Sequence, residues 1–408
     1  MNVKPMPILK PTSASDFQYI PYISQRYEYE LANLEYNSIK DSEKIKRLAY
    51  FKEFSGEETL HHEFCDQTNK IPITLSKNKI QYFKKNKYAV GYGVNGLYPY
   101  KGKFHGQMIR SIINILGLEN SDILLDPFAG SGTTNIEASL LNINSIAMDV
   151  NPFSRFLTTL KNDLLLSNYQ MFNGYYDLSK KIYPLLNKPI NSTFRKDLPF
   201  EKMLQVKLCY LSYFLARSYD IRNNTQKCKV NYDSVIKMYY NRLNSIYDYK
   251  RDNKLSLGKI TIDSKSSATD MSISSNSVDG IITSPPYSNM LDYPANDEYQ
   301  NRILGFNISD IRSMTIGIRN NASTSRIDTY LDDLSKFFAE SFRVLKSGKY
   351  LVFVIGYKEL ENQKYQLKNK IFASLSKIGF IHKRTIKKSI PGYRNKLLEE
   401  EIYFYQKQ

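Results

Sequence analysis

The chain has 408 residues, of which 42% are hydrophobic, and it carries a formal net charge of +17. This length allows two or three domains or one core with large insertions, and the apolar content excludes a globally disordered chain. No apolar run approaches the roughly 18 residues of a membrane span, and residues 1–10 lack the apolar stretch of a secretory signal. The three scattered cysteines show neither metal-ligand nor disulfide spacing, so we expect a cytoplasmic protein without a metal site.

The excess of positive charge favours a polyanionic partner such as nucleic acid. The chain is also rich in Lys, Ile, Asn and Tyr, a bias that AT-rich coding produces without any function. The total charge therefore leaves both interpretations open, and the distribution of the charge along the chain matters more.

Residues 1–98 form a polar, tyrosine-rich extension whose middle, residues 21–54, we expect to be helical. A loop signal follows at Gly91-Tyr-Gly-Val-Asn-Gly96. A helix is predicted over residues 105–116, because apolar side chains recur on one face and Gly117 ends the pattern.

An α/β pattern begins after this helix. Residues 122–126 predict a buried strand, and a glycine-containing turn and a helix over 134–141 follow. A second strand is predicted over 143–150, with Asp149 at its end. Strand, turn, helix and strand in this order open a doubly wound α/β domain.

Residues 161–254 interrupt that pattern with apolar residues at helical spacing. Residues 151–260 contain 19 Lys and Arg against 8 Asp and Glu, so this quarter of the chain carries +11 of the net charge. Tyrosines are interleaved with the basic residues, among them Tyr210, Tyr213, Tyr219, Tyr239 and Tyr240. Such a mixture favours a surface that tracks a nucleic-acid backbone and stacks on bases, but a helical insertion with core tyrosines and solvated lysines has the same composition.

The α/β pattern resumes after the insertion. Strands are predicted over 278–283 and 350–355, and helices over 331–344 and 366–375. Two last strands, over 380–389 and 401–405, are joined by a turn at Pro391-Gly392. The insertion therefore splits one α/β core.

The first chemical motif is Asp126-Pro-Phe-Ala-Gly-Ser-Gly-Thr-Thr134, between a strand and a helix. Its glycines let the backbone adopt positive φ and approach a ligand, and the N–H groups of the helix can meet a carboxylate. The spacing differs from G-x-G-x-x-G, and no Lys follows as in a phosphate-binding loop. Asp149 ends the next strand, where an acid hydrogen-bonds ribose hydroxyls in nucleotide-binding α/β folds.

The second motif is Thr283-Ser-Pro-Pro-Tyr287, directly after a predicted strand. Tandem prolines end the strand and hold their carbonyl groups rigidly. Ser284 adds a neutral hydrogen-bond acceptor and Tyr287 adds a flat ring. Together they can accept hydrogen bonds from an amino group and stack on a heterocycle.

With these motifs the sequence resembles the amino-group-specific DNA methyltransferases, which act on cytosine N4 or adenine N6, and a bacterial subgroup with a Ser-Pro-Pro-Tyr motif. Lys103-Phe-His-Gly-Gln-Met108 is similar to the helix that closes over the methionine part of the cofactor in that family. Asp270 falls where the family places an acid near the adenine ring, and the run to Leu291-Asp-Tyr293 resembles the subgroup. The resemblance covers roughly residues 99–160 and 260–408.

The resemblance implies a Rossmann-like class I methyltransferase fold with a seven-stranded, mostly parallel sheet, S-adenosyl-L-methionine as cofactor and double-stranded DNA as partner, with a companion restriction endonuclease in a restriction-modification system. It divides the chain into an N-terminal extension (1–98), the cofactor half of the core (99–160), the basic insertion (161–254) and the catalytic half (255–408). The residues it assigns to cofactor binding are Phe104, Asp126, Phe128, Gly130, Ser131, Gly132, Thr133, Asp149 and Asp270, and those it assigns to catalysis are Ser284, Pro285, Pro286 and Tyr287.

The insertion precedes Asp270, which is earlier than the usual position of a recognition domain in this motif order, so we expect either the insertion or the N-terminal extension to read DNA. Ser284 and the Pro285 carbonyl would accept hydrogen bonds from the amino group of a flipped base, which would stack on Tyr287. The motif contains no Cys, which argues against C5 chemistry through a thiolate. Ser at position 284 favours cytosine N4, while adenine N6, a tRNA guanine-N2 methyltransferase and a nucleic-acid-binding protein with a degenerate site stay as alternatives.

Overall fold

The computed structural model describes residues 17–20, 23, 25–39, 42–54, 56–68, 91–188, 203–224, 226–287, 293–317, 325–357, 361–390 and 398–408. None of the helices in these ranges combines the length and the apolar character that crossing a lipid bilayer requires.

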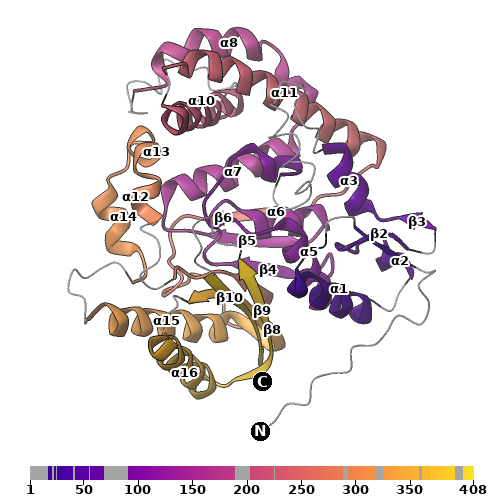
Figure 1. Ribbon diagram of the computed structural model, residues 1–408, viewed down its shortest axis with the longest axis vertical. Coiled ribbons are helices and arrows are strands. Elements are labelled where there is room, and N and C mark those ends of the chain that lie inside the picture. The colour runs from indigo at the N-terminus through magenta and orange to yellow at the C-terminus, as the bar shows by residue number, and fades with distance from the viewer. Residues whose placement is uncertain are drawn as a thin grey trace.

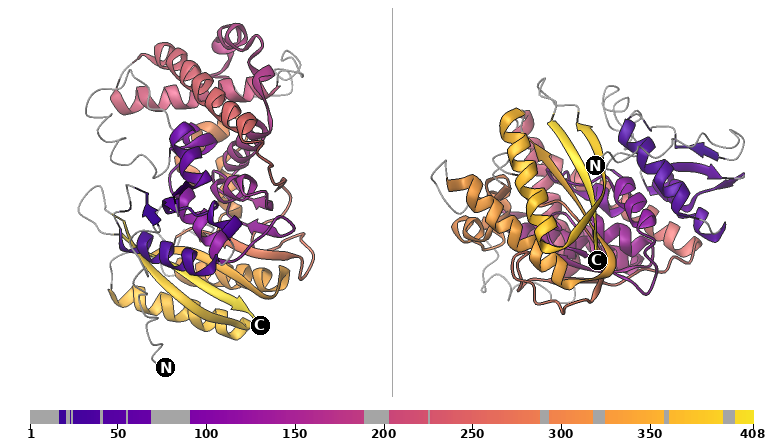
Figure 2. Two further views of the ribbon diagram at one scale, coloured as in Figure 1. Left: turned by 90° about the vertical axis from the view of Figure 1, so that its right-hand side faces the viewer. Right: turned by 90° about the horizontal axis from the view of Figure 1, so that it is seen from below.

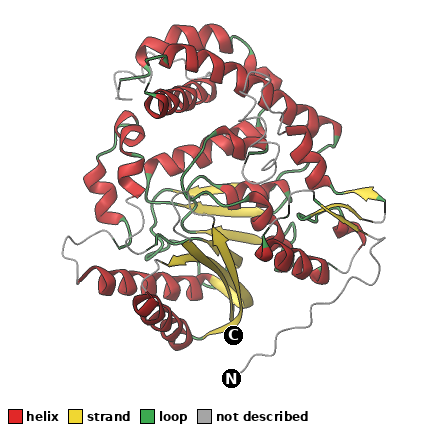
Figure 3. Ribbon diagram, viewed as in Figure 1, coloured by secondary structure: helices red, strands yellow, loops and turns green. Residues whose placement is uncertain are grey.

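A seven-stranded sheet forms the centre of the molecule, in the order β6-β5-β4-β7-β8-β10-β9 (Figures 1 and 3). Its strands are β4 (Ile123–Asp126), β5 (Asn144–Met148), β6 (Ile260–Asp263), β7 (Val278–Thr283), β8 (Leu345–Tyr357), β9 (Phe380–Ile390) and β10 (Leu398–Lys407). Neighbours are parallel from β6 to β8, and β10 is antiparallel to both β8 and β9. The predicted seven-stranded, mostly parallel α/β sheet is confirmed.

The strand order reverses between β4 and β7, because the chain builds outward from β4 through β5 to β6 and then returns to β7. In doubly wound folds a ligand binds at the carboxyl ends of the strands at such a switch point. The first motif follows β4 and the second follows β7, so the topology brings both to this point.

Two helical layers cover the sheet (Figure 2). On one face, α5 (Gly106–Ile115) and α6 (Thr133–Leu140) pack with α1 (Arg26–Ser38) in a core that includes Val354, Ile386 and Ile402. On the other face, α15 (Ser325–Val344) and α16 (Glu361–Ile378) pack against Phe353 and Tyr403. Alternate residues of β8 and β10 thus pack into the cores on opposite faces of the sheet, as the two-residue period of a strand requires.

Most predicted core elements lie within a few residues of the observed ones, and β7 matches its predicted bounds. The predicted turn at Pro391-Gly392 lies outside the described residues. Within the described ranges, three short helices follow the second motif: α12 (Tyr293–Asn296), α13 (Glu298–Ile303) and α14 (Ile308–Met314).

The N-terminal segment differs in part from the prediction. The helical expectation for residues 21–54 is met by α1 and the short α2 (Ser42–Ile45), but β2 (Phe51–Phe54) pairs with β1 (Phe17–Tyr19) and β3 (Glu57–Glu58) in a separate small sheet. The next described element after α3 (Leu60–Thr68) is a 3-10 turn, η1 (Gly93–Leu97), which occupies the predicted loop. Pairing between distant residues, which the sequence pattern does not report, decides these strands.

The insertion is helical as predicted. After α7 (Pro152–Leu166), short 3-10 turns η2 (Tyr169–Phe172) and η3 (Tyr183–Leu185) flank α8 (Tyr175–Ile182), and α10 (Met203–Asn223) and α11 (Cys228–Asp252) form a long helical hairpin above the core (Figure 1). Its tyrosines are a correction to the stacking-surface interpretation: Tyr210, Tyr213 and Tyr239 are buried in the core of the insertion, and Tyr219 packs against it. Tyrosines at helical spacing here supply apolar packing, while basic residues such as Arg222, Lys227 and Lys229 are exposed.

Candidate active site

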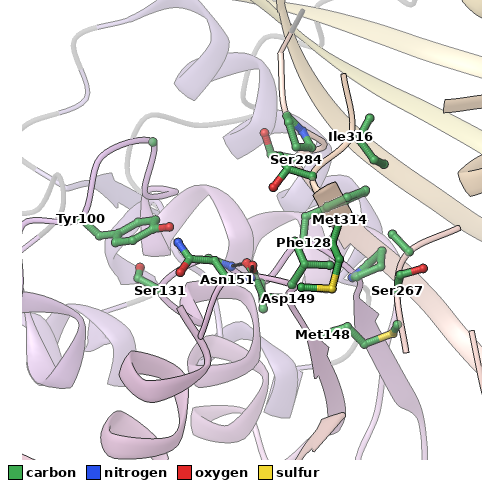
Figure 4. Close-up of a pocket in the computed structure, with 18 of the residues that line it drawn as sticks. Tyr100, Phe128, Ser131, Met148, Asp149, Asn151, Ser267, Ser284, Met314 and Ile316 are labelled. Carbon is green, nitrogen blue, oxygen red and sulfur yellow. Dashed lines mark hydrogen bonds between the residues drawn. The ribbon is translucent and has the colours of Figure 1, made fainter. Parts of the chain in front are cut away.

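One cavity, open to solvent on one side, lies at the carboxyl ends of the central strands (Figure 4). Its wall consists of residues 100–104 before α5, 127–131 and 133 after β4, 148–151 after β5, 266–269 after β6, Ser284 and Pro286 after β7, and Pro294 and residues 314–316 beyond. Both motifs therefore face one space, in which Ser284 lies across from Ser131 and Asp149.

The glycine turn after β4 has the shape that its sequence predicts. Gly130 and Gly132 have φ of 52° and 76°, and a Cβ on Gly132 would lie 2.7 Å from Thr158. Ser131 and Thr133 line the cavity and are each 3% exposed, and their buried hydroxyls have no hydrogen-bond partner in the described structure. Beside the N-terminus of α6, two unpaired buried hydroxyls fit a polar, anionic group of a ligand.

Lys161 of α7 supports this turn from below. Its side chain is fully buried, and its Nζ donates to the Ser131 carbonyl over 2.6 Å. Burial lowers the pKa of Lys161 well below its ordinary value, and the charge of Lys103 adds to that effect. The sequence pattern does not single out Lys161, because a lysine on a predicted helix is normally solvated.

Asp126 lies beneath the cavity rather than in its wall. Its Oδ1 accepts hydrogen bonds from the Thr283 hydroxyl at 2.6 Å and from the Phe128 N–H at 3.1 Å. Burial raises the pKa of Asp126 to about 6. This carboxyl group ties the end of β4 to the end of β7, and so fixes the two motifs relative to one another.

Asp149 lines the cavity directly after β5. Its Oδ2 accepts from the Gly130 N–H and its Oδ1 from the Asn151 N–H, each at 2.8 Å. Burial raises its pKa, and these hydrogen bonds partly oppose that shift. Each carboxylate oxygen keeps a second lone pair, so the group can still accept a hydroxyl from a ligand.

The second motif presents Ser284 and Pro286 to the cavity, whereas Pro285 is buried and Tyr287 lies behind the cavity wall, so the predicted stacking face is not among the lining residues. The Ser284 Oγ donates to the Val354 carbonyl at 3.2 Å, and the Tyr287 hydroxyl lies at 3.4 Å. Because the single hydroxyl proton is directed at these acceptors, the Oγ lone pairs are free to accept a hydrogen bond from the cavity side.

Of the remaining residues assigned to cofactor binding, some line the cavity and others do not. Phe104 and Phe128 line the cavity with Gly130, Ser131 and Thr133, whereas Gly132 shapes the turn without lining the cavity. Asp270 is exposed and outside the wall, where residues 266–269 stand instead. In the described ranges no group of three His, Cys, Asp or Glu side chains is arranged to hold a metal.

A polar cluster that the sequence analysis missed ties the chain after the catalytic motif to the loop after β5. Asp297 Oδ2 accepts from Asn151 Nδ2 at 2.8 Å, and Asn301 Nδ2 donates to Asn151 Oδ1 at 3.0 Å. Burial raises the pKa of Asp297 to about 7. The partners stand 146 and 150 positions apart, so no local pattern marks them.

Residues 13–155 match the family model described as DNA methylase, the N6 and N4 methyltransferases. The chain is 30% identical over 144 residues to the type II methyltransferase M.BsoBI of Geobacillus stearothermophilus, covering 33% of this chain and 27% of that protein. It is 28% identical over 184 residues to the type II methyltransferase M.MjaII of Methanocaldococcus jannaschii, covering 45% of this chain and 30% of that protein. Among solved structures, a SAM-dependent methyltransferase from Methanosarcina mazei aligns over 71% of this chain and 94% of its own, with 12% identity and a TM-score of 0.33.

These matches confirm the resemblance to the amino-group DNA methyltransferases. The family match begins at residue 13, so it includes most of the N-terminal segment in which the motifs gave no resemblance. The matched stretches span less than a third of the length of either curated relative.

Proposed function

We propose that the chain is an S-adenosylmethionine-dependent DNA methyltransferase that modifies the exocyclic amino group of a flipped base, with cytosine N4 as its target. The observation that carries the proposal is the shared cavity, in which the glycine turn and Asp149 face Ser284. Methyl transfer is a direct displacement between two bound molecules. The loop that binds the cofactor and the residue that accepts a hydrogen bond from the target amino group must therefore face the same cavity.

The residues of the cavity wall fit the cofactor. The unpaired hydroxyls of Ser131 and Thr133, beside the α6 N-terminus, suit the methionine carboxylate, and Asp149 suits the ribose hydroxyls. Phe104 and Phe128 supply apolar contacts in the same wall. Bound there, S-adenosylmethionine supplies an activated methyl group, and no metal takes part in the proposal.

Ser284 positions the nucleophile. An exocyclic amino group is weakly nucleophilic because its lone pair is delocalised into the ring. Accepting its hydrogen on Ser284 Oγ, together with the Pro285 carbonyl, turns that lone pair toward the methyl group. Ser284 is neutral, as is the amino group, so it orients the nitrogen without ionising it.

Basic residues at the end of the α10–α11 hairpin are proposed to contact DNA. Arg222, Lys227 and Lys229 are exposed there. The hairpin approaches the site, because Arg217 of α10 stacks 4.2 Å above the ring of Tyr299 in α13, and α13 belongs to the segment that closes the cavity. Phosphate contacts from this tip would orient a duplex toward Ser284.

The test is direct. Purified protein is incubated with a methyl-labelled cofactor and either duplex DNA or unmodified tRNA, and the digested nucleosides are identified by mass spectrometry. N4-methylcytosine is the expected product. N6-methyladenine would overturn the base assignment, whereas labelled tRNA guanine with unmodified DNA would overturn the substrate class. Cofactor binding without any transfer would favour a nucleic-acid-binding protein.

The relatives' names as type II methyltransferases also support a place in a restriction-modification system. The partner would then be an endonuclease whose cleavage the methyl group blocks. Digestion of DNA from expressing and non-expressing hosts with the enzyme encoded beside this chain tests the pairing, and equal cleavage of both would exclude it.

A further inference from the structure

Behind the catalytic motif, Tyr287 is held by the sheet. Its hydroxyl donates to Glu400 Oε1 of β10 at 2.9 Å. Its ring lies against the backbone of β8 at Gly356, where an added Cβ would meet the ring carbons at 2.7 Å and 2.9 Å. Gly356 leaves room for the Tyr287 ring, and Glu400 holds the hydroxyl end of that side chain by a hydrogen bond.

Glu400 is itself paired with Lys388 of β9, whose Nζ donates to Glu400 Oε2 at 2.6 Å. The two side chains are 12% and 11% exposed, and α1 covers them with Tyr27, whose ring centroid lies 5.9 Å from Lys388 Nζ. The register places Gly356, Glu400 and Lys388 opposite one another in a single row across three strands.

The next row on the same face is apolar and consists of Val354, Ile402 and Ile386. On this face of the sheet, the Lys388–Glu400 ion pair therefore stands where the neighbouring row has core residues, directly behind Tyr287. Burying an ion pair seldom stabilises a fold more than packed apolar residues would, so stability alone does not account for this row.

The row also sets the direction of the hydrogen bonds. Lys388 can only donate, and ionised Glu400 can only accept. The Tyr287 proton is thereby committed to Glu400, and the Tyr287 oxygen is left to accept from Ser284. Ser284 in turn keeps its lone pairs for the cavity.

From this geometry we infer that Glu400, held by Lys388, is a positioning residue for methyl transfer: it fixes the Tyr287 side chain behind the motif and keeps Ser284 a hydrogen-bond acceptor toward the cavity. The inference rests on the proposed function for its catalytic consequence. The positioning itself is a property of the protein without substrate.

Glu400→Gln is the informative change because it keeps the shape. Gln must offer its carbonyl oxygen to Lys388, which leaves its NH₂ group facing the Tyr287 oxygen. The Tyr287 proton is then turned toward Ser284 and occupies the lone pair meant for the amino group. Single-turnover methyl transfer should fall at least about tenfold, with cofactor affinity within about twofold of the unchanged protein.

Glu401→Gln is the matched control. Glu401 is the next residue of β10, on the opposite face, where it accepts from Lys368 at 2.9 Å and from the Tyr403 hydroxyl. It has the same chemistry and burial but no contact with the motif, so its loss should leave the rate unchanged. In a Tyr287→Phe background, where the hydroxyl is absent, Glu400→Gln should cost less than about twofold.

A second readout needs no substrate. With 3-fluorotyrosine at position 287, the ¹⁹F resonance should move in Glu400→Gln and stay in place in Glu401→Gln. An unmoved resonance, equal rates in the two Gln variants, or undiminished loss in the Tyr287→Phe background would overturn the inference. A moved resonance in a protein that methylates no nucleic acid would instead refute the proposed function and leave the positioning intact.

Discussion

The sequence suggested a ligand-binding role both for the loop after β4 and for the α10–α11 hairpin. The loop has the predicted geometry, whereas most of the hairpin tyrosines are buried in a core. In the loop, residue identity and position carry the chemistry, so Gly130 adopts a positive φ and Ser131 lines the cavity. In the hairpin, the interleaved tyrosines that resembled a stacking surface are the core of the insertion. A motif tied to a strand end predicts geometry, whereas composition at helical spacing does not separate a packed face from a binding face.

The largest effect is expected at the catalytic motif. Tyr287→Ala removes the ring proposed to stack on the base and the hydroxyl that accepts from Ser284, and should lower the single-turnover rate at least about a hundredfold. Ser284→Ala deletes one acceptor and leaves the Pro285 carbonyl, so a loss of about tenfold is expected. Calorimetry should find cofactor affinity unchanged in both variants. Weakened cofactor binding would contradict the proposal that the loop after β4 binds the cofactor and the loop after β7 binds the base.

The next effect concerns the glycine turn. Gly132→Ala combines positive φ with a contact of 2.7 Å to Thr158, and should cost about 2–4 kcal/mol of unfolding free energy. Gly348→Ala is the control, because Gly348 has φ of 77° but nothing within 4 Å, and should cost only about 1–2 kcal/mol. Equal costs in urea denaturation would remove the argument that close packing shapes this turn.

The comparison also shows how far the sequence could predict the site. The bounds of β7 and the turn at Gly130 are local properties, set by strand burial and glycine conformation, and they were predicted well. The contact of Tyr287 with Glu400 spans 113 positions. It depends on which strands pair and in which register, and Glu400 lies in an acidic run that gives no sign of its role.

Asp270 illustrates the same limit within a family resemblance. Its position along the chain suggested a contact with the adenine ring, but the loop after β6 turns residues 266–269 to the cavity and leaves Asp270 exposed. Its part in cofactor binding stays a prediction. Asp270→Ala and Thr269→Ala, compared by calorimetry, would show which side of the loop meets the ligand.

Asp149 should have an intermediate effect. Asp149→Ala removes the proposed ribose acceptor and the bond to the Gly130 N–H, so cofactor affinity should fall at least about tenfold, or roughly 1.4 kcal/mol. Asp149→Asn keeps one acceptor oxygen and should lose less. Unchanged affinity in a folded Asp149→Ala protein would exclude the ribose assignment.

A pH effect is expected from Asp126, whose pKa burial raises from 3.8 to about 6. The folded protein then binds this proton more tightly than the unfolded chain, so this group's contribution to stability is greatest below about pH 4 and declines as the pH rises to about 6. Asp126→Asn cannot titrate and should flatten that part of the stability curve. An identical decline in the variant would assign the pH dependence to other groups.

The smallest effect decides whether the hairpin touches DNA at all. Each phosphate contact contributes about −0.9 to the slope of log affinity against log salt, so replacing Arg222, Lys227 and Lys229 with Gln should flatten that slope by at most about 2.7. These side chains are exposed, and the change should leave the fold and the cofactor affinity intact.

The matched control replaces Lys336, Lys370 and Lys377 on α15 and α16, at the opposite end of the molecule from the hairpin (Figure 1). It removes the same charge, so a general loss of attraction would weaken DNA binding equally in both triple variants. A local contact flattens the slope only in the hairpin variant, because only there are counterions released from bound phosphates. Equal slopes would reject the hairpin as a DNA-binding surface and shift attention to the N-terminal segment, which α1 docks against the core beside Lys388.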